Sequence, residues 1–242
     1  MHFITPKKFF MERLIIKDLE NWKNAKHRKP LIIQGARQVG KTWIMKKFGA
    51  LHYQQVVYIN FESSVRLQTI FKDDFDINRI ITIFEIESGI KINSETPLLL
   101  LDEIQEAEKG LTALKYFYEN AAEYHLIAAG SLLGVSIQKN NTFPVGKVAF
   151  LNLYPLSFEE FLINQNEAEL VKQIKTKQWD IVASFHEKIT NYLRLYYFVG
   201  GMPEAVKTYL SSNDFEEVRK IQHTIILGYE HDFAKYAPNE IV

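Results

Sequence analysis

The sequence predicts an α/β fold, in which helices cover both faces of a parallel β-sheet and a helical region follows. Short apolar runs of strand length alternate with amphipathic stretches up to residue 153, and the periods after Ser157 are helical. Strands that alternate with helices usually pair in parallel, and strands apolar at nearly every position are covered on both faces. We expect a sheet domain over residues 1–156 and a helical region over 157–242.

Apolar runs of four to six residues mark the expected strands, which are 31–34, 56–61, 98–102, 125–129 and 148–153. Helical periodicity predicts helices at 42–48, 77–87 and 111–122, and an earlier helix over 9–22 with Phe10, Leu14, Leu19 and Trp22 near one face. Ser157 and Glu160 have the spacing of a capping box, which predicts a helix start. Gly200, Gly201 and Pro203 predict the end of one helix and the start of the next.

Composition narrows the classes of function. Lys plus Arg and Asp plus Glu both total 29, so the net charge gives no argument for a nucleic-acid or anionic membrane partner. The absence of cysteine excludes disulfides and thiolate metal sites, and the seven histidines form no H-x-x-x-H pair. No apolar run approaches the roughly 18 residues of a membrane span, and no secretory signal is recognisable. We expect a cytoplasmic protein.

Residues 35–42 read G-A-R-Q-V-G-K-T, which is the G-x-x-x-x-G-K-T (Walker A) pattern between an apolar strand and a helix. In such a loop, backbone N–H groups and a helix N-terminus bind phosphate, the lysine contacts the β- and γ-phosphates, and the threonine hydroxyl binds Mg²⁺. We predict binding of ATP or ADP, with Arg37 facing either nucleotide or solvent. The predicted binding residues are Gly35, Ala36, Arg37, Gln38, Val39, Gly40, Lys41, Thr42 and Trp43.

A second signal is the apolar strand that ends in two acids, L-L-L-L-D-E-I-Q at 98–105. Asp102 at the strand's carboxyl end suits a partner of Mg²⁺, and Glu103 can deprotonate a water that attacks the γ-phosphate. Together with the loop, this pair predicts ATP hydrolysis. Neither the N-K-x-D and D-x-x-G strings of GTPases nor the L-S-G-G-Q string of transporters occurs, and the chain is too short for a two-domain helicase.

Five further strings follow the same order as in a known family. They are A-A-G-S-L-L-G, P-V-G-K-V, L-Y-P-L-S-F-E-E-F-L, G-G-M-P-E-A-V and D-F-A-K-Y-A-P. With the loop and the acidic pair, they resemble the predicted prokaryotic AAA+ ATPases, in which a P-loop domain precedes a domain of unknown function. The resemblance implies a sheet of strand order 5-1-4-3-2, a C-terminal helical lid, and ATP with Mg²⁺ as cofactors.

The resemblance also implies roles for three further residues. Ser131 corresponds to the polar sensor of the γ-phosphate, although it also suits a helix N-cap. Lys147 stands where the family usually has a catalytic arginine, and because lysine lacks the planar fork of arginine its role as a finger stays open. Pro203, in G-G-M-P, resembles a turn that lies against adenine in related signalling ATPases, and a simple helix junction is the alternative.

The family continues beyond D-F-A-K-Y-A-P, so we expect residues 157–242 to hold the lid and the start of a truncated C-terminal region. Val218, Ile221, Ile225 and Tyr229 share one helical face. Either the lid covers this face, or the face is exposed and promotes self-association.

We interpret the chain as an AAA+ domain that binds and hydrolyses ATP and acts as a conformational switch. Hydrolysis is expected to be slow if Lys147 cannot replace the arginine. The alternative is a nucleotide-dependent module that binds nucleic acid or protein, with vestigial hydrolysis. For the basic stretch K-N-A-K-H-R-K at 23–29, a solvated helix end and a contact with nucleic-acid phosphates are both open.

Overall fold

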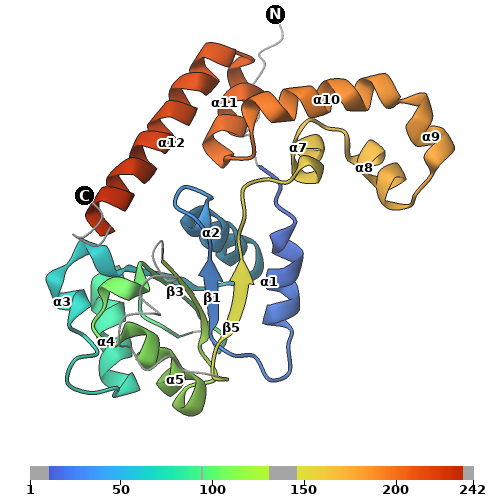
Figure 1. Cartoon of the computed structure of the whole chain (residues 1–242). Coiled ribbons are helices and arrows are strands. Elements are labelled where there is room, and N and C mark those ends of the chain that lie inside the picture. Colours follow the sequence, from blue (N-terminus) through green and yellow to red (C-terminus); the bar gives the residue numbers. More distant parts are fainter. Residues whose placement is uncertain (1–10, 94, 131–145, 237–242) are drawn as a thin grey trace, which may run out of the picture. The chain divides into compact units, whose positions relative to one another are not determined.

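The computed structural model describes residues 11–93, 95–130 and 146–236, with side chains described as far as residue 231 (Figure 1). These residues form two compact units. The first is Ile15–Leu153, and the second consists of the described residues from Tyr154 onward together with residues 11–14. The helical unit therefore contains a short piece of the N-terminal segment.

The first unit contains one five-stranded sheet. Its strands are β1 (Leu31–Gln34), β2 (Val56–Asn60), β3 (Leu98–Asp102), β4 (His125–Ala129) and β5 (Ala149–Asn152). All neighbouring pairs are parallel, in the order β2-β3-β4-β1-β5. This is the order 5-1-4-3-2 read from the other edge, so the predicted fold class is confirmed. The five strands match their predicted ranges to within one residue at each end.

Helices cover both faces of this sheet, as the apolar runs predicted. They are α1 (Ile15–Lys23), α2 (Lys41–His52), α3 (Val65–Gln68), α4 (Ile77–Ser88) and α5 (Gly110–Asn120). Ile32, Leu99 and Leu101 point into a core shared with α4 and α5. Because successive strand residues face opposite sides, their neighbours face α2, which packs on β3 and β4. Trp22 of α1 packs on Phe48 of α2, with ring centroids 6.5 Å apart.

The helix predicted over 9–22 is wrong at its beginning. Helix α1 begins at Ile15, Leu14 is 42% exposed, and Phe10 lies outside the described residues. The physical reason is that the backbone N–H of Leu14 donates to the carboxylate of Glu160, at 2.8 Å. Residues 11–14 are therefore held by the helical unit, and the helix starts only where this contact ends.

The second unit is helical throughout its described part. Its helices are α7 (Phe158–Asn164), α8 (Ala168–Lys175), α9 (Trp179–Ser184), α10 (His186–Val199), α11 (Pro203–Ser212) and α12 (Phe215–Tyr236). The predicted capping box is present, since Ser157 Oγ accepts from the N–H of Glu160 at 3.2 Å and Glu160 Oε2 accepts from that of Ser157 at 3.0 Å. Pro203 is the first residue of α11, as the helix-junction interpretation predicted. Among the helices described in both units, none is long and apolar enough to cross a bilayer.

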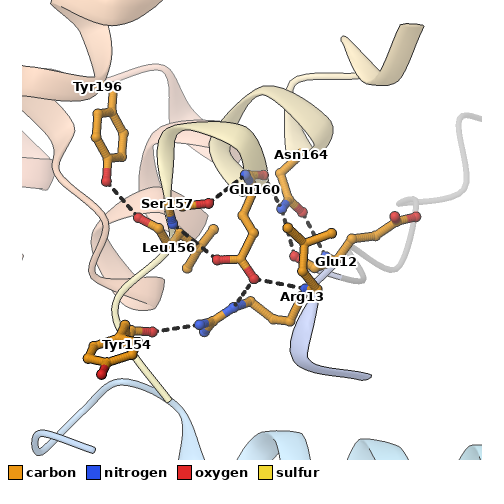
Figure 2. A network of polar contacts seen from close by, with 9 residues as sticks. Glu12, Arg13, Tyr154, Leu156, Ser157, Glu160, Asn164 and Tyr196 are labelled. Carbon is orange, nitrogen blue, oxygen red and sulfur yellow. Dashed lines mark hydrogen bonds and ion pairs between the residues drawn. The ribbon is translucent and has the colours of Figure 1, made fainter. Parts of the chain in front are cut away.

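A buried ion pair holds the N-terminal segment on α7 (Figure 2). Arg13 Nε donates to Glu160 Oε1 at 3.0 Å, and Arg13 Nη2 donates to the carbonyl oxygen of Tyr154 at 2.6 Å. Asn164 adds a pair of bonds to the backbone of Glu12, accepting from its N–H at 2.8 Å and donating to its carbonyl oxygen at 2.9 Å. One carboxylate thus both caps α7 and binds the segment.

Two of the strings that carry the family resemblance meet in the second unit. The backbone N–H of Leu156 donates to the carbonyl oxygen of Gly201 at 2.6 Å. The carbonyl oxygen of Leu156 accepts from the hydroxyl of Tyr196 at 2.7 Å. A Cβ atom at Gly201 would lie 2.3 Å from the carbonyl oxygen of Leu156. Glycine at position 201 therefore allows the close backbone approach of the L-Y-P-L-S and G-G-M-P strings.

The apolar face predicted on the last helix is covered in part by its own unit. Val218 and Ile225 are buried, and Ile221 packs against the core that contains Val218, Leu156 and Phe161. The first of the two predicted alternatives, cover by the lid, therefore holds for Val218 and Ile221.

The ion pair of Arg13 leads to a stability prediction. Replacing Arg13 with Ala leaves the buried Glu160 carboxylate without its cation, so the free energy of unfolding should fall by about 3 kcal/mol or more. Urea denaturation measures this change. The control is Lys172→Ala, which removes an exposed pair with Glu169 and should cost under about 1 kcal/mol. Equal losses in the two variants would contradict the role given to the ion pair.

Candidate nucleotide site

The predicted phosphate loop connects the carboxyl end of β1 to the first turn of α2. Gly40 is the N-cap of α2 in a left-handed conformation, with φ 92° and ψ 27°, which glycine adopts without steric cost. A glycine cap supplies no side-chain acceptor to the first N–H groups of the helix. These groups, with the positive end of the helix dipole, suit an anion.

Gly35 is required by the approach of β5. The N–H of Leu153 donates to the carbonyl oxygen of Gln34 at 2.7 Å, which extends the pairing of β1 and β5. A Cβ atom at Gly35 would lie 2.2 Å from the carbonyl oxygen of Leu153. Any larger side chain would therefore push the loop away from the sheet.

Lys41 is the buried cation of the loop. It is 6% exposed, and its Nζ donates to the carbonyl oxygens of Gly35 at 2.9 Å and of Ala36 at 2.8 Å. Burial lowers the pKa of Lys41, and the nearby carboxylates of Glu103 and Asp102 oppose that shift. The loop backbone thus holds an ammonium group where the sequence predicted a contact with phosphate.

The structure brings together the two residues predicted to hold Mg²⁺. Leu100 and Asp102 share the face of β3 on which α2 lies, so the carboxylate points toward the first turn of that helix. Thr42 Oγ1 donates to Asp102 Oδ2 at 2.7 Å, and Asp102 is only 3% exposed. Mg²⁺ prefers oxygen ligands and usually takes only one or two from the protein besides phosphates and waters. Within the described residues, no group of three or more acids or histidines offers a different metal site.

Tyr58 is a member of the site that the sequence analysis missed. It lies on β2, and its hydroxyl donates to Asp102 Oδ2 at 2.9 Å. Burial is the main cause that raises the pKa of Tyr58, and the hydrogen bond to Asp102 raises it further. The phenol is therefore a donor at neutral pH. The sequence did offer one signal for Tyr58. It lies two residues before the end of β2, and the predicted strand order places β2 beside β3.

Glu103 follows directly in an unusual backbone conformation. Its φ of 51° and ψ of 46° are left-handed, which costs a non-glycine residue on the order of 1 kcal/mol or more. Its N–H donates to Asp102 Oδ1 at 3.2 Å, and its Oε2 accepts from Gln105 Nε2 at 2.5 Å. Gln105, present in D-E-I-Q but given no role from the sequence, therefore orients the predicted base.

Comparison with known protein families identifies the family of this chain. A model for an AAA domain matches residues 27–162, more than half of the chain. The chain belongs to the AAA domain family. A second model, for a domain of unknown function (DUF8612), matches residues 190–241, as the predicted resemblance implied. A comparison with curated proteins found no match.

Of two solved structures that resemble this chain, the first supports the fold. A Walker-type ATPase of Pyrococcus abyssi is 15% identical, with a TM-score of 0.56 over 95% of this chain and 77% of that chain. The RuvB Holliday junction branch migration motor of Thermotoga maritima is also 15% identical, with a TM-score of 0.39 over 66% of this chain and 51% of that chain. At such identities, the likeness to the first structure concerns the P-loop ATPase fold alone.

Lys147 of the AAA domain lies away from its own phosphate loop. It comes just before β5, and since β5 is parallel to β1, it lies at the amino edge of the sheet, whereas the loop follows the carboxyl edge. Its Nζ pairs with Glu119 Oε1 at 3.0 Å and lies 5.5 Å from the ring centroid of Tyr118. The structure therefore does not bring Lys147 together with Lys41 and Glu103.

Among the further predicted site residues are Arg37, Trp43, Ser131 and Pro203. Ser131 lies outside the described residues. Arg37 and Trp43 are exposed, and the Nζ of Lys47 lies 4.9 Å from the Trp43 ring centroid. Pro203 belongs to the other unit, so its predicted place against adenine stays a prediction.

Two residues of the basic stretch at 23–29 donate hydrogen bonds to backbone carbonyl oxygens of the sheet unit. Lys23 Nζ donates to the carbonyl oxygen of His52, the last residue of α2, at 2.5 Å. Arg28 donates to the carbonyl oxygens of Lys23 and, just beyond the end of α5, of Ala122. Cations beside the negative ends of helices are stabilising. These contacts favour the interpretation of the stretch as a helix end.

The approach of β5 to Gly35 gives a second prediction. Gly35→Ala should lower the free energy of unfolding by more than Gly89→Ala, as measured by urea denaturation, because only the former adds a clash with backbone. Gly89 is a suitable control because it has a φ of 68° and nothing within 4 Å of its Cβ position, so its substitution costs only the left-handed penalty of about 1–2 kcal/mol. A smaller loss at Gly35 would contradict this account of the loop.

Proposed function

We propose that this AAA domain binds ATP with Mg²⁺ and hydrolyses it to ADP and phosphate, and that it works as a conformational switch. The observation that carries the proposal is the hydrogen bond from Thr42 to the buried Asp102 carboxylate, directly beside the loop that holds Lys41. Glu103 lies next in the chain, at the same end of β3. Loop, metal partner and candidate base are thus adjacent at one edge of the sheet.

Each residue has a distinct task in this proposal. Phosphate oxygens are bound by the N–H groups at the start of α2 and by the ammonium of Lys41. To reach them, Lys41 gives up its hydrogen bonds to the carbonyl oxygens of the loop. Thr42 presents hydroxyl lone pairs to the cation while its O–H donates a hydrogen bond to Asp102. Mg²⁺, when bound, neutralises charge that builds up on the phosphate oxygens. Glu103, oriented by Gln105, accepts a proton from the attacking water.

The alternative proposal, a nucleotide-dependent binding module with vestigial hydrolysis, draws on Lys147. This residue replaces the arginine usual in the family, and it is paired with Glu119 at the edge opposite the loop. A finger role for Lys147 would therefore require the loop of a neighbouring copy. An intact Glu103 beside Asp102 supports hydrolysis over this alternative, and the internal contacts of Lys23 and Arg28 weigh against nucleic acid as the partner.

Loss of the loop cation tests nucleotide binding. Lys41→Ala should abolish Mg-ATP binding in isothermal titration calorimetry, because it removes the ammonium group from the phosphate contacts. Lys26→Ala, which changes an exposed lysine outside the loop, should bind as the unmodified protein does. Unchanged affinity in Lys41→Ala would remove the central claim.

A substitution at Glu103 should separate ATP binding from ATP hydrolysis. Glu103→Gln keeps size and hydrogen bonding but loses the base, so ATP should still bind while turnover falls by roughly 10² or more. Phosphate release at saturating ATP measures this. Glu108→Gln, a nearby exposed acid, should retain turnover. Equal rates in Glu103→Gln and the unmodified protein would mean that the base is elsewhere.

A further inference from the structure

We infer that Tyr58 is a positioning residue for the cation site: its hydroxyl fixes the carboxylate of Asp102, and through it the orientation of the Thr42 hydroxyl. This inference rests on the proposed function, because it concerns Mg²⁺ at Thr42. It assigns a role to a strand, β2, that carries neither the phosphate loop nor the acidic pair.

Two hydroxyl donors meet on a single carboxylate oxygen. Asp102 Oδ2 accepts from Thr42 Oγ1 at 2.7 Å and from Tyr58 at 2.9 Å. A carboxylate oxygen offers two lone pairs, and these donors occupy both. Since Asp102 is 3% exposed, bulk water does not readily replace a donor that is removed.

The shared oxygen sets the direction of the threonine hydroxyl. A hydroxyl has one proton and two lone pairs. While its proton points at Asp102 Oδ2, the lone pairs of Thr42 point elsewhere and are available to a cation. Without Tyr58 the carboxylate keeps its bonds to Thr42 and to the N–H of Glu103, but it is freer to turn about its last bond. The acceptor for the Thr42 proton is then less firmly fixed.

The phenol ring is itself held from a second side. Tyr58 pairs in register with Leu100, so it shares the α2 face of the sheet with Asp102. Lys46, one helical turn after Thr42 on α2, places its Nζ 3.6 Å from the centroid of the Tyr58 ring. A cation over an aromatic face is attracted to it. The ring is thus fixed by α2 at its face and by β3 at its tip.

The test is the Mg²⁺ dependence of nucleotide binding in Tyr58→Phe. Binding of a fluorescent ATP analogue is measured at rising Mg²⁺, and again in excess chelator. The half-saturating Mg²⁺ concentration should rise about tenfold, as for other residues that orient metal ligands. Binding in chelator should be unchanged, because the phenol contacts Asp102 and not the phosphate loop.

Tyr53→Phe is the matched control. It also removes a tyrosine hydroxyl from a hydrogen bond, 2.6 Å from His125 Nδ1 at the amino edge of the same sheet. Its half-saturating Mg²⁺ concentration should equal that of the unmodified protein. In an Asp102→Asn background, Tyr58→Phe should add no further change, because the phenol acts through that carboxylate.

The outcomes separate this inference from the function on which it rests. An unmodified protein whose nucleotide binding does not respond to Mg²⁺ would refute the proposed function. If binding does respond, an unchanged half-saturation in Tyr58→Phe would overturn the inference alone. A Tyr58→Phe protein that fails to fold, while Tyr53→Phe folds, would make the hydroxyl a stability element and would also overturn it.

Discussion

The carboxylate of Asp102 links the elements on which the site depends. Placing a carboxylate in a protein interior costs several kcal/mol unless hydrogen bonds replace the lost water. Here α2 supplies Thr42, β2 supplies Tyr58, and the turn after β3 supplies the N–H of Glu103. Satisfying this one acid therefore fixes three segments around the end of β3. Stability and the geometry of the site follow from the same contacts.

A second buried carboxylate has a comparable effect in the helical unit. Glu160 accepts from Arg13, from the N–H of Leu14 and from the N–H of Ser157. It thereby joins the cap of α7 to a segment about 147 positions earlier in the sequence. Each unit thus uses one carboxylate to hold segments that no local sequence pattern connects.

Local patterns predicted the elements well because their causes are local. Apolar runs gave the five strands, and the spacing of Ser157 and Glu160 gave the start of α7. Gly35 and Gly40 could be assigned to a phosphate loop because backbone conformation and close approach limit those positions to glycine. The confirmed strand order came from the family resemblance, since periodicity does not determine how strands are arranged.

What the sequence did not predict depends on register and on distant partners. Tyr58 contacts Asp102 only because β2 and β3 pair in one particular register. The start of α1 was placed too early because the acceptor of the Leu14 N–H is the distant Glu160. Gln105 lies in a recognised string, but its contact with Glu103 depends on the left-handed turn at that residue. Side-chain hydrogen bonds of this kind leave no periodic trace in the sequence.

The direction of the strands also bears on how fast the proposed switch can turn over. Lys147 precedes β5, whereas the phosphate loop follows the parallel β1. Strand β5 has four residues, so at roughly 3.3 Å per residue the two edges lie about 13 Å apart. Lys147 is also paired with Glu119 at its own edge. On the proposed function, a single copy therefore stabilises the developing phosphate charge with Lys41 and the bound cation, without Lys147. That arrangement favours the slow turnover of a switch over the rapid turnover of a motor.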